Sequence, residues 1–203
     1  MLKLITVNFL VSTLIGIPIG VVCSLAAWWI IFHAVVPKLE FSEHISKVQD
    51  ERNNGSLTYR IKFRNCGSRD IVDVQLFARV YVKGLNPQSP STRRVVLIPL
   101  RIAHWPTLDV KGGAKLTALL PEKAVALTES WYPQPVREKA TNGTLTLEDI
   151  LAMGVSAELQ VAAFAYDAFS GTRKVFVSKY YATADLKEGR FKTDSLDVAP
   201  PAP

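Results

Sequence analysis

The sequence has few of the residues from which catalytic and metal-binding sites are built. It contains 2 cysteines and 3 histidines, and the histidines, His33, His44 and His104, are far apart along the chain. There is no His-Glu-x-x-His, no paired Cys-x-x-Cys, no Gly-x-Ser-x-Gly and no glycine-rich phosphate loop. We therefore expect no catalytic residue, no metal site and no cofactor, and a protein that is not an enzyme.

The two cysteines are placed where an ordinary disulfide between them is not expected. Cys23 lies in an uncharged N-terminal run, whereas Cys66 lies at a turn of the remaining domain. A domain built without disulfides fits a reducing compartment.

Asp, Glu, Lys and Arg are absent from residues 4–37, a run of 34 positions in which His33 is the one basic side chain. The hydrocarbon core of a bilayer demands about 20 apolar residues in helical form. Residues 1–37 are therefore predicted to form one transmembrane helix, with the lipid bilayer as its partner. A cleaved signal peptide fits less well, because the run is long and Trp28 and Trp29 stand where small residues would mark cleavage.

The orientation of this helix is weakly indicated by charge. Lys3 precedes the uncharged run, and Lys38, Lys47 and Arg52 follow it. Because cytoplasmic flanks are enriched in Lys and Arg, the sequence favours a cell-membrane protein with a cytoplasmic domain. The bias is small and leaves the orientation open.

Small residues recur every four positions in the uncharged run, at Ser12, Gly16, Gly20 and Ser24. Small side chains at this spacing let a second helix approach closely, which predicts a helix–helix interface. The alternative is that Gly and Ser are common in membrane helices in general. The two interpretations carry equal weight on sequence alone.

Aromatic and basic residues close the predicted helix and define a membrane interface. Its members are Trp28, Trp29, Phe32 and Lys38. Trp is enriched where a helix leaves the bilayer. Since Lys38 leads with no flexible spacer into a predicted strand, we expect the helix and the domain to act as one piece.

The rest of the chain carries mixed charge and strand-like periodicity. Of the 24 basic residues, 23 follow Pro37, as do all 18 acidic residues, which gives this part a net charge of +5. No basic run is present, so no nucleic-acid partner is expected. Alternating apolar residues over 57–64 and 72–82 predict two long strands. Thr146, followed by Glu148 and Asp149, predicts the start of a short helix.

Many antiparallel strands with one small helix predict a mainly β fold, an immunoglobulin-like antiparallel β-sandwich over residues 38–191. The segment 192–203 ends in Pro and Ala and is predicted to be disordered.

The order of these elements resembles the junction and cytoplasmic domain of inward-rectifier potassium channels. The segments that carry the resemblance are PKLEFS at 37–42, RDIVDVQLFAR at 69–79, LEDI at 147–150 and ADLKEGRF at 184–191. The likeness covers residues 20–191 in order. The family's pore loop and Thr-Val-Gly-Tyr-Gly selectivity filter have no counterpart in the chain. The resemblance implies a homo-oligomer, a tetramer in that family, without a pore of its own.

Three functions follow from these observations. The first is an oligomeric accessory or sensing subunit in ion transport, with a channel-like regulatory domain. The second is a membrane-tethered β-sandwich module that binds proteins and has no connection to channels. In a third, the uncharged run would enter a heteromeric pore as an inner helix, with the filter on a channel-forming partner protein.

Overall fold

The computed structural model of the chain describes residues 2–30, 37–50, 56–85, 88–89, 91–129, 132–193 and 195–200. The chain divides into two compact units, Met1–Val36 and Pro37–Pro203. Residues 31–36, which join them, lie outside the described residues. The expectation that helix and domain act as one piece therefore stays a prediction.

The first unit is a single helix, α1, over Leu2–Trp29. Its 28 residues include Pro18, whose nitrogen has no hydrogen to donate to the helical ladder. Among the residues that the structure describes in full, no helix is both long enough and apolar enough to cross a membrane.

The second unit is mainly β, as the sequence predicts, with ten strands and short helices among its described residues. The strands are β1 (Leu39–Phe41), β2 (Ile45–Asp50), β3 (Ser56–Asn65), β4 (Ile71–Lys83), β5 (Arg93–Ile98), β6 (His104–Leu108), β7 (Lys115–Leu119), β8 (Ser156–Asp167), β9 (Arg173–Val177) and β10 (Leu186–Glu188). The helices are α2 (Gln134–Thr141) and α3 (Leu147–Leu151), with short 3₁₀ turns at Pro121–Lys123, Val125–Thr128 and Thr183–Asp185.

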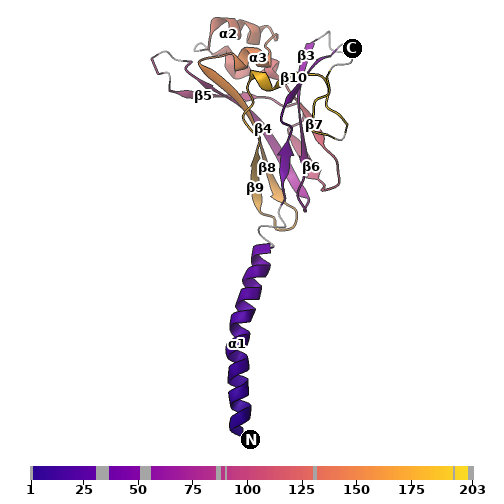
Figure 1. Cartoon of the computed structure of the whole chain (residues 1–203). Helices are drawn as coiled ribbons and strands as arrows, with labels where there is room; N and C mark the ends of the chain where they lie inside the picture. Colours follow the sequence, from indigo (N-terminus) through magenta and orange to yellow (C-terminus); the bar gives the residue numbers. More distant parts are fainter. Residues whose placement is uncertain are drawn as a thin grey trace. The chain divides into compact units, whose positions relative to one another are not determined.

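The strands form two sheets (Figure 1). Sheet A has the order β1-β3-β2-β10, with β7 also paired to β3, and sheet B has the order β5-β4-β8-β9, with β6 also paired to β4. The pairs between these strands are antiparallel, except that β10 runs parallel to β2. Both sheets contribute to one hydrophobic core, as expected for a β-sandwich.

The alternation in β3 places its apolar side in that core. Tyr59, Ile61 and Phe63 are buried, as predicted. Full burial of side chains of this size contributes roughly 1.5–3 kcal/mol each. Leu57, predicted on the same side, is exposed, because β7 pairs with β3 only from Tyr59 onward and leaves Leu57 beyond its end.

A bulge in β4 changes which residues of that strand face the core. The register with β8 shifts between Val72 and Gln75, and Asp73 has a φ of 51°. Asp tolerates this left-handed conformation better than most residues. Ile71 and Val74 are buried on either side of the bulge, whereas Val72 is only partly buried. The predicted apolar stripe is confirmed from Val74 to Val82 and is wrong at Val72.

The predicted helix start at Thr146 is confirmed. Its Oγ1 accepts a hydrogen bond from the Asp149 N–H at 3.2 Å, and Asp149 Oδ2 accepts one from the Thr146 N–H at 3.0 Å. This reciprocal capping box begins α3. Figure 1 shows α2 and α3 together at one end of the domain.

The C-terminal segment differs from the predicted disordered tail. Its described residues, 192–193 and 195–200, fold back along the domain, and Phe191 forms a β-bridge with Val198. Gly189 makes this return possible, since a Cβ at that position would lie 1.8 Å from the carbonyl oxygen of Ala199. Amino-acid composition does not predict this ordered segment, because the order depends on hydrogen bonds to backbone carbonyls, which every residue has.

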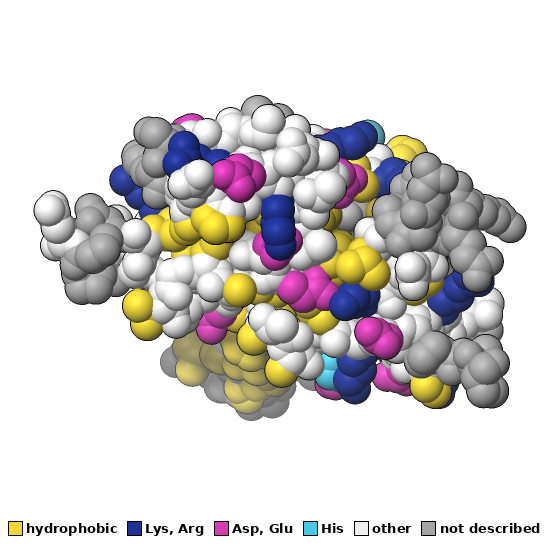
Figure 2. Space-filling model, turned by 90° about the horizontal axis from the view of Figure 1, so that it is seen from above, with side chains coloured by type: hydrophobic (Ala, Val, Ile, Leu, Met, Phe, Trp, Pro, Cys, Tyr) yellow, Lys and Arg dark blue, Asp and Glu magenta, His cyan; other side chains and the backbone are white. Residues whose placement is uncertain are grey.

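Charges of both signs are interspersed over the face of the molecule that is seen from above (Figure 2). Small groups of hydrophobic side chains lie between them. This mixture is typical of a solvated surface rather than of one large field of a single sign.

Candidate functional site

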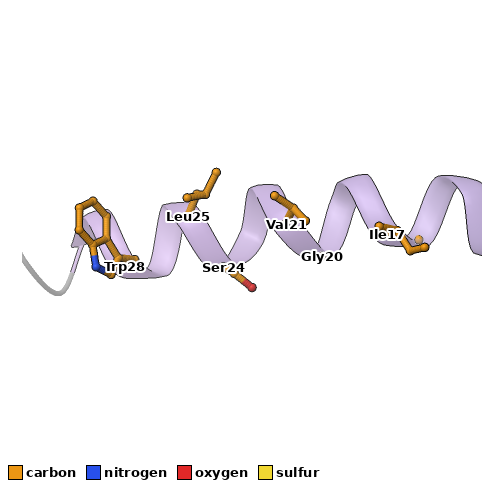
Figure 3. A pocket seen from close by; sticks show the side chains of 7 residues that line it. Ile17, Gly20, Val21, Ser24, Leu25 and Trp28 are labelled. Atoms are coloured by element: carbon orange, nitrogen blue, oxygen red, sulfur yellow. The ribbon is translucent and has the colours of Figure 1, made fainter.

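The predicted helix–helix interface lies on one face of α1. Gly16, Gly20 and Ser24 line a shallow hollow there, bordered by larger side chains that include Ile17 and Trp28 (Figure 3). The side chain of Ser12, the fourth predicted member, lies outside the described residues.

The two glycines of this hollow are not required by the helix itself. A Cβ built at Gly16 or at Gly20 would meet no atom within 4 Å. Larger residues therefore fit at both positions in the isolated helix. If small residues are required at Gly16 and Gly20, the requirement therefore comes from a contact outside α1.

The residues predicted to lie at the membrane interface are only partly described. Trp28 and Trp29 are exposed near the end of α1, whereas Phe32 lies outside the described residues. Lys38 is exposed at the start of the domain, where its carbonyl oxygen accepts a 2.8 Å hydrogen bond from the Cys66 N–H. The backbone at Lys38 is thereby held to the turn after β3.

The described residues contain no group of three or more His, Cys, Asp or Glu side chains that could hold a metal ion. His104 Nε2 lies 2.8 Å from Asp73 Oδ1, the carboxylate at the bulge of β4. His44 Nδ1 lies 4.0 Å from Asp185 Oδ1, which is also 2.6 Å from the ammonium group of Lys179.

A partly buried polar cluster joins sheet A to α3. Glu148 accepts a hydrogen bond from the Tyr59 hydroxyl and lies 2.7 Å from the ammonium group of Lys47. Burial, together with the Glu148 carboxylate, raises the pKa of Tyr59 above its usual value. Burial opposes ionisation of Glu148, but the hydrogen bonds from Lys47 and Tyr59 outweigh it and lower its pKa. The groups of this cluster satisfy one another and tie sheet A to α3.

A buried carboxylate, Asp167, closes the end of sheet B. It accepts hydrogen bonds from the Phe169 N–H at 3.1 Å, Ser170 Oγ at 2.8 Å and Arg69 Nη1 at 3.1 Å. Burial alone would raise the pKa of Asp167, but these three donors lower it below the usual 3.8. The Arg69 guanidinium also stacks 4.4 Å from the centre of the Phe169 ring.

The side of sheet B that faces away from the core carries exposed apolar residues, and we call it the sheet B outer face. Strand register assigns its apolar members: Phe77 and Tyr81 of β4, Val95 and Leu97 of β5, Ala162 and Phe164 of β8, and Val175 and Val177 of β9. Its polar and charged members are Gln75, Arg79 and Lys83 of β4, Arg93 of β5, Glu158 and Gln160 of β8, and Arg173 of β9. The Phe77 and Phe164 rings meet edge to face, with centroids 5.4 Å apart. These two aromatic rings join the central strands β4 and β8 on this face.

Arginine side chains lie over the aromatic rings of this face. The guanidinium carbon of Arg173 is 5.0 Å from the centre of the Phe164 ring, and that of Arg79 is 5.9 Å from the Phe77 ring. Arg93 lies 4.1 Å from the Tyr81 ring and 3.9 Å from the Glu158 carboxylate. The sheet B outer face thus combines exposed apolar side chains with cationic ones.

The sequence predictions did not include this surface. The residues opposite the apolar stripe of β4 are mostly polar, which is typical of a solvated side. One signal was present, because Phe77 and Tyr81 stand among those polar positions and β9 is rich in valine. Only the strand order brings these residues onto one face.

A comparison with protein-family models gave no match, and a comparison with curated proteins gave none either. The likeness to the inward-rectifier cytoplasmic domain therefore rests on the sequence pattern of this chain.

Proposed function

We propose that this chain is a membrane-tethered binding module, in which α1 anchors an immunoglobulin-like β-sandwich that binds other proteins and catalyses no reaction. The observation that carries the proposal is the exposure of large apolar side chains all around α1. More than half of the surface of each of these side chains is exposed: Leu14, Ile15, Ile17, Ile19, Val21, Val22 and Leu25.

Exposure at consecutive positions matters because successive residues of a helix point about 100° apart. A helix packed against protein on one side would be polar on the other. The helical backbone of α1 spans 28 residues, about 40 Å at 1.5 Å per residue, against about 30 Å for the hydrocarbon core of a bilayer. The sequence of α1 carries no Asp, Glu, Lys or Arg after Lys3. Lipid is the environment that suits such a surface.

The anchor is tested by extracting membranes from cells that express the full chain with alkaline carbonate. We expect the chain to stay with the lipid, and the double variant I17K/V21K to be released, since a charge at the centre of a bilayer costs about 2.5–3.5 kcal/mol. The control K123E/K187E changes two exposed charges of the domain instead. Extraction of the unmodified chain into the supernatant would refute the anchor.

The side of the membrane on which the domain lies is tested through native Cys66, which is exposed. With the C23S variant as background, a membrane-impermeant maleimide should label Cys66 only after the cells are opened. The variant C23S/C66S gives the background signal. Labelling in intact cells would contradict the proposed cytoplasmic placement, yet leave the anchor standing.

A second candidate is the channel-related accessory subunit, an oligomer in ion transport that has no pore of its own. The open space beside Gly16 and Gly20 favours it, because close helix packing is one reason for a helix to keep small residues there. Chemical crosslinking in native membranes should then give a closed oligomer, and the purified chain in proteoliposomes should conduct no potassium. A strictly monomeric chain would count against this candidate and not against the tethered module.

A further inference from the structure

The sheet B outer face leaves several large apolar side chains exposed. Leu97 and Val177 are each 58 % exposed, Val175 is 55 % and Val95 is 48 % exposed. Val175 and Val177 belong to β9, whereas Val95 and Leu97 belong to β5. The two strands lie on opposite sides of the Phe77 and Phe164 pair. Contiguous apolar patches on a protein surface mark sites of interaction.

The charges of this face are unbalanced. On the outward side of the four strands lie four cationic side chains, Lys83, Arg79, Arg93 and Arg173, and two carboxylates, Glu158 and Asp73, the second of which is paired with His104. Glu158 lies beside Arg93. Among the described residues, neither Arg79 nor Arg173 forms an ion pair with a carboxylate. Two guanidinium groups are therefore held over aromatic rings with their hydrogen-bond donors directed at no acid.

We propose that the sheet B outer face binds a partner protein through a segment that carries apolar side chains flanked by carboxylates. Apolar residues of the segment pack on Phe77, Val175 and Val177. Its carboxylates accept hydrogen bonds from Arg79 and Arg173, whose planar guanidinium groups match carboxylate geometry.

The charge distribution argues against a second copy of the chain on this face. A twofold interface brings the same patch of both subunits together. Arg79 and Arg173 of one copy would then face a surface of like charge, which costs free energy in a desolvated interface. An acidic partner removes this penalty and steers the encounter.

The geometry of the face also fits an extended segment. Side chains on one side of a strand repeat about every 7 Å, and neighbouring strands lie about 4.8 Å apart. Phe164 and Ala162 lie at this repeat along β8, and Val175 and Val177 lie opposite them on β9. A partner in extended conformation presents every second side chain at the same spacing.

The experiment selects linear peptides from a displayed random library on the full chain in lipid nanodiscs. The recovered peptides should combine Asp or Glu with Val, Leu, Ile or Phe. Binding of a recovered peptide should be at least about tenfold weaker to R79E/R173E and to V175S/V177S, since a tenfold loss is about 1.4 kcal/mol and interface anchors exceed that. The control is R101E, an exposed arginine outside the face.

A graded variant separates recognition from misfolding. R79K/R173K keeps both charges but loses the planar, bidentate donors, so binding should fall between the unmodified chain and R79E/R173E. Near-ultraviolet circular dichroism should be the same for all variants.

Three results would overturn the proposal. The recovered peptides could lack carboxylates, or they could bind R79E/R173E as well as the unmodified chain. Alternatively, phosphatidylcholine–phosphatidylserine vesicles could compete with the peptides for this face, which would assign it to anionic lipid. None of these results bears on whether α1 anchors the chain, which carbonate extraction measures separately.

Discussion

The ammonium group of Lys62, in β3, donates a 2.6 Å hydrogen bond to the carbonyl oxygen of Lys192 in the C-terminal segment. It also donates to the carbonyl oxygens of Thr193 at 2.7 Å and Ser195 at 2.8 Å. Only 5 % of the Lys62 surface is exposed, and these three carbonyl dipoles help to stabilise its buried charge. A single side chain thereby holds the end of the chain against sheet A.

Replacing Lys62 with Met should release the C-terminal segment. Three carbonyls would lose a charged donor, and a lost hydrogen bond to a charged group is worth about 1.5–3 kcal/mol. Hydrogen exchange in residues 189–199 should accelerate by about tenfold or more. The matched control is K123M, at an exposed lysine. Exchange unchanged from that of the original chain would show that Lys62 does not hold the segment.

Asp167 should make the domain sensitive to acid. Its pKa is lower in the folded domain than the usual 3.8, so it stabilises the fold above that pH, and the contribution is lost as the pH falls through the folded pKa. D167N should cost about 1–3 kcal/mol at pH ~7, because asparagine offers the three donors one uncharged acceptor oxygen in place of a carboxylate. It should also lose less stability in acid than the original chain does. Urea denaturation of the full chain in micelles measures both effects.

The control for this experiment is D109N, which removes an exposed carboxylate. If D167N and the original chain lost the same stability between neutral pH and acid, Asp167 would not contribute to the acid sensitivity.

The capping box at the start of α3 should contribute measurably to stability. T146A removes the side-chain acceptor for the Asp149 N–H and should lower the free energy of unfolding by about 1 kcal/mol. T144A replaces an exposed threonine nearby and should have little effect. Equal losses from the two variants would argue that the cap is not the cause.

The stripe of small residues on α1 should be sensitive to size if helices pack there. G20I fits the isolated helix without a clash and fills the hollow, so it should reduce crosslinked oligomers in native membranes. A26I adds similar bulk on a different side of the helix and should leave crosslinking unchanged. A G20I chain that crosslinks like the original would remove this face from the interface.

Local patterns predicted those parts of the fold that depend on near neighbours. The period-2 stripes of β3 and β4 and the cap at Thr146 involve residues only a few positions apart, and the structure confirms most of each. The errors at Leu57 and Val72 have distant causes. One depends on where β7 ends and the other on a bulge in the pairing with β8.

The candidate surfaces divide in the same way. The small-residue stripe of α1 was predictable, because a helix brings positions four apart onto one face. The sheet B outer face was not, because Leu97 and Val177 share it only through the strand order β5-β4-β8-β9.

The sequence by itself determined that an uncharged helical run precedes a mainly β domain, since composition and side-chain periodicity act over short distances. Only the tertiary structure decided which strand faces are covered, because periodicity defines two faces but not their neighbours. Lys62 is buried under the carbonyls of residues 192, 193 and 195, more than a hundred positions away, whereas Phe77, an apolar residue, is left partly exposed.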